Sequence, residues 1–552
     1  MRTFSLYLSA LYALGSLLCT CLALADTVPP WSMGQPLITY GNYRGLPPDA
    51  PANNPCAVYS PGGEGYPQLE NAYGWPSQYD PTTLTTTIAQ QTSALGFNLA
   101  AINDPSQPRS GASQLQIAGQ SGMRAQLLLG EPCSPTNVIF GLVSPTSSCT
   151  LGNWQSSCWP TPAAASYLNT LISEFQSSPA AYSYALADEP CVRPSPGSPL
   201  DPTNNAGDAC GSKMPLLAAI SAYIGARDPT RLIYVNLLPP SYGPPELTFS
   251  STSTSSGTTY SYTTYTSWSA YLADFVNQVH PSLLSYDSYP FKTNTQGTPY
   301  DDIAFLTDAQ TVAQASVQYS IPFMAYVQGI SLNLGVQLRV PTATQLDYEA
   351  NALLAFGAHG ISYFNYWCLG GPSCGGIAPN YTSGTPTTVD NELQSLNPHF
   401  RRIAARLQGL RWMGTYLKGY SPVPAGLAGL PGNPTFDIPA LQNNMTWSPS
   451  PSGPSSTSGP PMKGALIGYF GIAGSRPALA YVVNLDYTNG YTYRVTGPGP
   501  MSVFNASTGG WTPTGQPYAD VTLTPGGGVL VGLTSSTNEA TWLPEVIEQA
   551  LQ

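Results

Sequence analysis

An eightfold alternation of short apolar runs with longer helical segments extends over residues 36–410 of this 552-residue chain. Each apolar run has the length of a buried strand, and the apolar positions between the runs recur at helical spacing. The runs are 37–42, 97–103, 125–129, 182–187, 232–237, 283–286, 322–327 and 361–366. The helical patterns lie near residues 81–95, 111–122, 163–177, 214–226, 267–279, 301–318, 342–357 and 391–409. Thr342 and Gln345 have the spacing of a capping box, which predicts a helix beginning there.

Eight strand–helix units in this order are typical of an α/β fold, the (β/α)8 TIM barrel. An open, doubly wound sheet is the alternative. That fold usually has fewer strands and a phosphate-binding glycine turn, but the chain contains neither a G-x-G-x-x-G motif nor a P-loop. The sequence therefore favours the barrel, which we expect to span residues 26–412.

The pattern changes after Gly409. Short alternating runs separated by turn residues predict a small all-β sandwich domain over residues 413–552. The runs include 478–484, 491–495, 501–504 and 529–533. Two low-complexity stretches interrupt the chain. The Ser/Pro/Gly-rich stretch at 448–461 is expected to be a loop or linker, and the Ser/Thr-rich tract at 249–267 follows the fifth strand and is expected to overhang the barrel mouth.

Charged residues are scarce, at 9% of the chain against roughly 25% in an ordinary soluble domain. The formal net charge of −11 argues against binding to nucleic acid, which requires basic patches. Hydrophobic residues make up 42% of the chain, so it can bury a large core and is not expected to be disordered. Only three histidines are present and no C-x-x-C occurs, so we expect no metal and no cofactor.

The N-terminus has the features of a secretory signal peptide at residues 1–25. Arg2 precedes an apolar run over residues 4–24, and Ala23-Leu24-Ala25 is an A-x-A cleavage pattern. We expect cleavage before Asp26 and a secreted, periplasmic or cell-surface protein with no stable membrane insertion. An uncleaved membrane anchor is the alternative, because the apolar run is long for a signal peptide.

Eight cysteines remain after residue 25, and an even number in an exported chain indicates disulfide bonds. All eight follow predicted strands, which places them at the end of the barrel where active sites lie. They are Cys56, Cys133, Cys149, Cys158, Cys191, Cys210, Cys368 and Cys374. We predict the local bridges Cys191–Cys210 and Cys368–Cys374, and the other four cysteines would pair among themselves.

Polar and aromatic residues follow most of the predicted strands. Two acids, Asp188 and Glu189, stand side by side after the fourth strand, and Pro190 is expected to keep Glu189 extended. The other residues at strand ends are Asn103, Glu131, Asp287, Tyr289, Gln328, Asn365 and Trp367. Glycosidic cleavage needs a protonated carboxylic acid and a second group at the anomeric carbon. Aromatic faces can cover the apolar side of a pyranose, so the predicted rim suits a sugar.

Three features of the predicted strand ends resemble those of the TIM-barrel glycoside hydrolases. They are the acid-Pro sequence after strand 4, Tyr-Pro after strand 6 and Trp after strand 8. In the large retaining clan A group, strand 4 ends Asn-Glu-Pro and its Glu is the acid/base, which corresponds to Glu189. That group's nucleophile is a Glu at the end of strand 7, where this chain has Gln328.

The adjacent Asp and Glu also resemble those of the substrate-assisted hexosaminidases of glycoside hydrolase families 20 and 123. This resemblance implies that Asp188 polarises the 2-acetamido group of the substrate and that Glu189 is the general acid/base. It also implies that Tyr289 and Trp367 form an acetamido pocket or stack on the sugar. The C-terminal sandwich is similar to the accessory β domains that often follow such barrels.

The combined hypothesis is an exported glycoside hydrolase that cleaves O-glycosidic bonds of an oligo- or polysaccharide. Its candidate catalytic residues are Glu189, Asp188 and Asp287, with Asp188 either polarising the substrate or forming a carboxylate pair with Asp287. Its candidate substrate-binding residues are Glu131, Asn103, Tyr289, Gln328, Asn365 and Trp367. The alternatives are a non-catalytic carbohydrate-binding barrel, because the seventh strand lacks a Glu, and a cell-surface structural protein.

Overall fold

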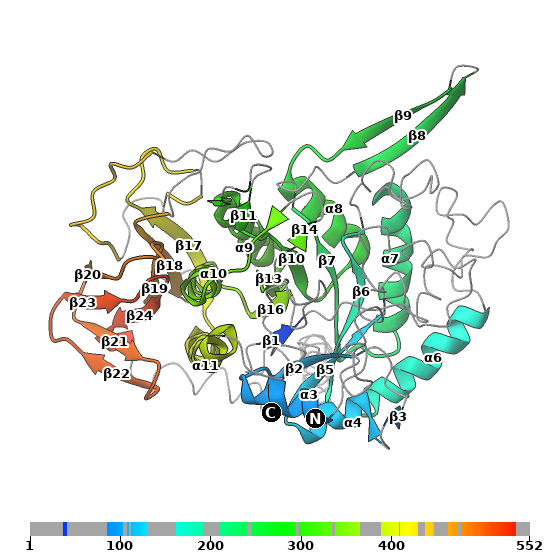
Figure 1. The fold of residues 1–552 in the computed structure, drawn as a ribbon, viewed down its shortest axis with the longest axis horizontal. Helices are drawn as coiled ribbons and strands as arrows, with labels where there is room; N and C mark the ends of the chain where they lie inside the picture. The colour runs from blue at the N-terminus through cyan, green and yellow to red at the C-terminus, as the bar shows by residue number, and fades with distance from the viewer. Residues whose placement is uncertain are drawn as a thin grey trace, which may run out of the picture.

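The computed structural model shows an α/β barrel joined to an antiparallel β region (Figure 1). The structure describes residues 37–40, 86–102, 108–109, 112–129, 162–190, 210–239, 246–254, 257–293, 297, 299–329, 332–333, 337–364, 388–407, 409–424, 426–428, 436–446, 462–471 and 476–536. The predicted signal peptide and the 448–461 loop lie outside these residues.

Eight parallel strands form one sheet in the order β1-β16-β13-β10-β7-β6-β5-β2. They are β1 (Leu37–Tyr40), β2 (Leu99–Ile102), β5 (Arg124–Leu128), β6 (Ala181–Asp188), β7 (Leu232–Leu237), β10 (Leu284–Asp287), β13 (Phe323–Gln328) and β16 (Gly360–Phe364). The two ends of this order, β1 and β2, also contact each other, so the sheet curls round on itself. Neighbouring strands follow chain order with no reversal. A doubly wound sheet reverses its order, so the barrel is confirmed and the open sheet is excluded.

Among the described residues, one helix lies before each barrel strand from β2 to β16, and another follows β16. The helices are α3 (Thr86–Ala94), α4 (Gln114–Gln120), α6 (Pro162–Gln176), α7 (Cys210–Gly225), α8 (Trp268–Val279), α9 (Ala304–Tyr319), α10 (Ala343–Ala355) and α11 (Thr388–Leu407). The capping box of Thr342 and Gln345 begins α10 as predicted. Within the described ranges, no helix combines the length and the apolar character needed to cross a membrane.

Both faces of the barrel strands are buried. Along β7, Leu232 and Tyr234 belong to a cluster inside the barrel, whereas Ile233 and Val235 pack in the large cluster that includes the surrounding helices. The inner cluster also contains Leu99, Ala101, Tyr182, Ala185, Leu283 and Met324. Burial on both faces explains why the strands appear in the sequence as continuous apolar runs.

The connections after β2, β7, β10 and β13 contain short additional strands. These are β3 (Pro108–Arg109), β4 (Ala112–Ser113), β8 (Glu246–Thr254), β9 (Gly257–Thr264), β11 (Phe291–Thr293), β12 (Pro299–Asp301), β14 (Leu332–Asn333) and β15 (Gln337–Leu338). Strands β8 and β9 form an antiparallel hairpin that projects from the barrel (Figure 1). The Ser/Thr-rich tract at 249–267 therefore forms most of this hairpin. Threonine is β-branched and favours strands, which outweighs the low complexity of this sequence.

The C-terminal region is a two-layered β structure, as predicted. A six-stranded sheet has the order β17-β18-β19-β24-β21-β22, and a separate pair, β20-β23, covers one of its faces. The strands are β17 (Arg411–Lys418), β18 (Ala465–Gly471), β19 (Leu479–Asn484), β20 (Tyr491–Thr496), β21 (Met501–Asn505), β22 (Gly510–Pro513), β23 (Tyr518–Leu523) and β24 (Gly528–Leu533). Helix α11 ends at Leu407 and β17 begins at Arg411; the domain limits 26–412 and 413–552 stay predictions.

The other face of the six-stranded sheet packs on the barrel through α10. Tyr481 of β19 donates a hydrogen bond to Oδ1 of Asn351 at 2.6 Å, and the Asn351 amide donates to the carbonyl of Gly526 at 3.1 Å. Gly468 of β18 lies against the main chain of Ala355, so close that a Cβ at residue 468 would be 2.0 Å from the Ala355 oxygen. The two regions therefore share a tightly packed, hydrogen-bonded interface.

Candidate active site

The C-terminal ends of β6, β7 and β10 bring acids and an amide to one rim of the barrel. Asp188 is the last residue of β6 and pairs in register with Asn236 of β7. Asn236 in turn pairs with Ser285 of β10, which ends at Asp287. Parallel strands share their C-terminal edge, and active sites of barrels are built there.

Glu189 follows β6 in a left-handed backbone conformation, with φ of 41°. Its main-chain N–H donates to the carbonyl of Asn236 at 2.9 Å, and the residue is partly exposed. The expectation that Pro190 keeps Glu189 extended is therefore wrong. A non-glycine residue at positive φ is strained, and such strained residues cluster at active sites.

Asp287 lies at the end of β10 with only 4% of its surface exposed. Its Oδ1 accepts a hydrogen bond from Nδ2 of Asn236 at 3.1 Å, and Ser285 Oγ donates to Oδ1 of the same asparagine at 3.1 Å. Asn236 thus contacts Glu189 through its main chain and Asp287 through its side chain. The sequence analysis missed Asn236; the only signal was a polar residue in the second-last position of an apolar run.

Aromatic residues of α8 lie near Glu189. Burial raises the pKa of Tyr271 well above its ordinary value, and the negative charges of Tyr265 and Glu189 add to this effect. The Tyr271 ring packs against Tyr265 and Trp268, with ring centroids 5.0 and 5.5 Å away. The Glu189 carboxylate therefore lies near a cluster of aromatic side chains.

Tyr289 follows Asp287 after one intervening serine and is almost completely buried. Its ring stacks on Phe364, the last residue of β16, with centroids 5.8 Å apart and planes 23° apart. Tyr289 thus joins the ends of the sixth and eighth barrel strands. Its predicted contact with the sugar stays a prediction.

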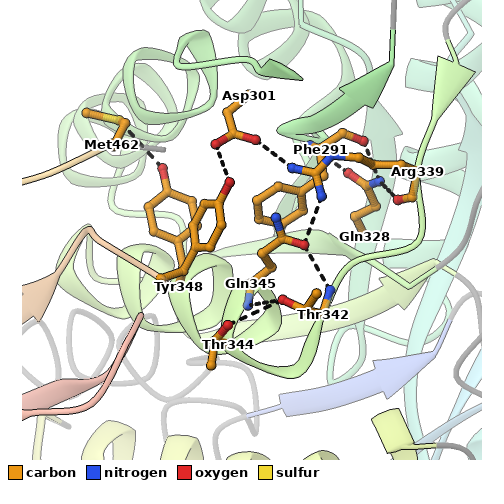
Figure 2. A network of polar contacts seen from close by, with 10 residues as sticks. Phe291, Asp301, Gln328, Arg339, Thr342, Thr344, Gln345, Tyr348 and Met462 are labelled. Atoms are coloured by element: carbon orange, nitrogen blue, oxygen red, sulfur yellow. Dashed lines mark hydrogen bonds and ion pairs between the residues drawn. The ribbon is translucent and has the colours of Figure 1, made fainter. Parts of the chain in front are cut away.

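Gln328 is not available to hold a sugar, which corrects its predicted role. It is 0% exposed, and its side-chain amide is bound to main-chain groups of the neighbouring connections (Figure 2). Oε1 accepts from the N–H of Phe291 at 3.0 Å, and Nε2 donates to the carbonyls of Phe291 at 2.8 Å and Arg339 at 2.6 Å. Gln328 therefore fastens the connections after β10 and β13 to each other.

An ion pair and further hydrogen bonds support the same connections. Arg339 pairs with Asp301 at 2.6 Å and also donates to Gln345, the capping residue of α10, at 2.9 Å (Figure 2). Tyr487 of the C-terminal region donates to Asp301 at 2.6 Å. Burial raises the pKa of Asp301, while the hydrogen bonds from Tyr487 and Arg339 and the charge of Arg339 oppose that rise. The β sandwich thus helps to fix the rim that follows Asp287.

The remaining predicted site residues are Glu131, Asn103, Asn365 and Trp367, and they lie outside the described residues. Of Asp188, only the main chain is described. The cysteines of the predicted disulfide bonds also lie outside the described residues, except for Cys210 at the start of α7, of which only the main chain is described. In the parts of the chain that are described, no group of three or more His, Cys, Asp or Glu side chains is arranged to hold a metal ion.

No family model matches the sequence, and no curated protein matches it either. Solved structures with a similar fold include a glycoside hydrolase family 5 protein from Bacteroides vulgatus, at 11% identity and a TM-score of 0.45, covering 85% of this chain and 91% of that one. A family 42 β-galactosidase from G. stearothermophilus has 8% identity and a TM-score of 0.45, over 80% of this chain and 94% of that one. A β-galactosidase from the haloarchaeon Halorubrum lacusprofundi has 10% identity and a TM-score of 0.41, over 90% and 99%.

Proposed function

We propose that this protein is an exported glycoside hydrolase that cleaves O-glycosidic bonds of an oligo- or polysaccharide. The observation that carries the proposal is the hydrogen-bonded connection from Glu189 through Asn236 to Asp287 at the C-terminal rim of the barrel. Two acids at one rim supply what glycosidic cleavage requires, a proton donor and a second carboxylate.

The surroundings of the two acids suit different roles. Glu189 is partly exposed and lies near the Tyr271 cluster, so its carboxyl group is open to a bound substrate. Glu189 is therefore the proposed general acid/base, which protonates the leaving oxygen. Asp287 accepts an amide hydrogen bond, which favours the charged carboxylate. Asp188 either polarises the substrate or joins Asp287 in a carboxylate pair.

Substrate binding in this proposal depends on neutral polar groups and aromatic rings rather than on charge. The proposed sugar-binding residues are Glu131, Asn103, Tyr289, Asn365 and Trp367, without Gln328. Such a site suits a neutral carbohydrate, because hydroxyl groups are bound by amides, hydroxyls and main-chain groups.

A hydrolysis assay on a panel of glycans tests the proposal directly. Glu189→Gln keeps the shape of the side chain and removes its proton transfer, so turnover should fall by about 10²–10⁴-fold. Asp188→Asn and Asp287→Asn are assayed beside it. The matched control is Asp520→Asn, an exposed carboxylate of β23 whose side chain is 48% accessible, and it should leave turnover unchanged. Wild-type turnover by Glu189→Gln would refute the proposed role.

The same panel tests the alternative of a non-catalytic carbohydrate-binding barrel. The seventh strand ends in a buried glutamine rather than in an acid, so no carboxylate comes from that position. Saturable binding of a glycan with no release of reducing sugar would favour this alternative. Turnover that prefers N-acetylated sugars would instead support the substrate-assisted mechanism, with Asp188 as the polarising residue.

Export and disulfide formation belong to the same proposal. A signal peptide ending at Ala25 predicts a mature N-terminus at Asp26, which intact-mass measurement of the secreted protein can detect. Peptide mapping without reduction should find Cys191 linked to Cys210 and Cys368 linked to Cys374. A protein that retains residues 1–25 and sediments with membranes would support the anchor alternative.

A further inference from the structure

Asn236 contacts Glu189, Asp287 and Ser285 from a buried position at the end of β7. Its side chain is only 6% exposed. The main-chain carbonyl accepts the N–H of Glu189 at 2.9 Å, Nδ2 donates to Asp287 at 3.1 Å, and Oδ1 accepts from Ser285 at 3.1 Å.

Ser285 fixes which way the Asn236 amide points. An asparagine side chain has one acceptor end and one donor end, and a carboxylate can only accept. Because the Ser285 hydroxyl donates to Oδ1, the NH₂ end is directed at Asp287. A hydrogen bond donated to a carboxylate stabilises its charged form and is stronger than a bond between neutral groups.

We propose that Asn236 is a positioning residue that holds Asp287 as the charged partner of Glu189. The inference rests on the proposed glycosidase function and deepens it by naming the residue that keeps the second carboxylate, Asp287, charged. The role does not depend on how Asp287 acts, because a carboxylate that activates water and one that attacks the anomeric carbon must both be charged.

The first test is the pH dependence of kcat/KM in Asn236→Ala and Asn236→Asp. Removing the amide should move the acid limb of the profile to higher pH by about one unit, because it withdraws a hydrogen bond that stabilises the charged carboxylate. On the acid limb, below the wild-type apparent pKa, the kcat/KM of Asn236→Ala should therefore fall about tenfold relative to wild type, and it should recover on the plateau above the limb. Asn236→Asp should lose more, because it places a second carboxylate against Asp287.

Asn397→Ala is the matched control. Asn397 is also buried, accepts a hydroxyl hydrogen bond from Tyr363 at 2.8 Å and donates its amide to the carbonyl of Leu95 at 2.8 Å, but it lies on α11. Its loss should lower stability and leave the acid limb in place. Ser285→Ala is the milder variant should Asn236→Ala fail to fold, and it should move the limb in the same direction by a smaller amount.

A second readout needs no substrate. The carboxyl carbon of Asp287, assigned by its loss in Asp287→Asn, should titrate at higher pH in Asn236→Ala than in wild type by nuclear magnetic resonance. An unchanged titration and an unchanged acid limb would overturn the inference, even where Glu189→Gln is inactive and the proposed function stands. If Glu189→Gln keeps full turnover, the role of Glu189 fails; if wild type hydrolyses no glycan, the proposed function fails. In both cases the Asp287 titration still shows whether Asn236 controls that charge.

Discussion

Replacing Gln328 with methionine should destabilise the protein by about 2–4 kcal/mol. Methionine keeps the length of the side chain and removes both polar ends of the amide. The Phe291 N–H and the Arg339 carbonyl would then lose their partner in a buried site, at about 1–2 kcal/mol each. The Phe291 carbonyl would lose one bond but keep another, because it also accepts the Arg339 N–H at 3.0 Å.

Gln126→Met is the matched control. Gln126 is also a buried glutamine, 1% exposed, and its register partner Ala101 belongs to the cluster inside the barrel. Among the described residues, neither end of its amide has a hydrogen-bond partner. Removing an unpaired buried amide should leave the free energy of unfolding unchanged or raise it by about 1 kcal/mol.

Urea unfolding of the two variants, followed by tryptophan fluorescence, measures both changes. The midpoint should fall in Gln328→Met and not in Gln126→Met, with a similar dependence on denaturant in both. Equal stability of Gln328→Met and wild type, together with a raised KM on a glycan substrate, would refute the structural role and restore sugar binding by Gln328.

Two further variants test the packing of α10. Burial, together with the charge and hydrogen bond of Glu392, raises the pKa of Asp347 to about 8, so its protonated form is favoured by folding. The stability that this protonation contributes is fully present below the ordinary pKa near 3.8 and is lost as the pH rises through about 8. Asp347→Asn cannot lose a proton, so it should flatten the fall in Tm between pH 6 and pH 9. A Tm profile as steep as that of wild type would contradict this. Gly468→Ala should lower stability by about 3 kcal/mol or more, because its Cβ would lie 2.0 Å from the Ala355 carbonyl oxygen. The control is Gly510→Ala in the same sheet, where the nearest atom to the new Cβ would be a hydroxyl oxygen 3.7 Å away, so the denaturation midpoint should change little. An equally small loss of stability in Gly468→Ala would show that the contact with Ala355 can relax to accept a methyl group.

The barrel strands were predictable because their signal is local. Strand β7 covers the predicted run 232–237 without change, and β13 is displaced by one residue from 322–327. Burial on both faces makes each such strand a short apolar run between turn residues, and that pattern is visible in the chain alone. The sequence assigned no structure to the tract that forms β8 and β9, because its Ser/Thr-rich sequence contains few apolar residues to mark the strands.

The site was predictable only in part. Asp188, Glu189 and Asp287 follow strands in the sequence, so their place at the rim follows from the fold class. The left-handed backbone conformation of Glu189 could not be predicted, because its hydrogen bond to the Asn236 carbonyl outweighs the local preference set by Pro190. A polar residue at a strand end looks the same in sequence whether it faces a substrate or folds back over a loop, as Gln328 does.

The sequence alone determines three features that depend on residues close together in the chain. They are the order of the eight strands along the chain, the adjacent acids after the fourth strand and the alternating strands of the C-terminal region. Their physical cause is the periodic burial of apolar side chains, which leaves its mark on neighbouring positions. The contact of Asn236 with Asp287 spans 51 residues, and that of Gln328 with Phe291 spans 37. These contacts form only when the strands become neighbours in the curled sheet, which brings distant side chains and main-chain groups together.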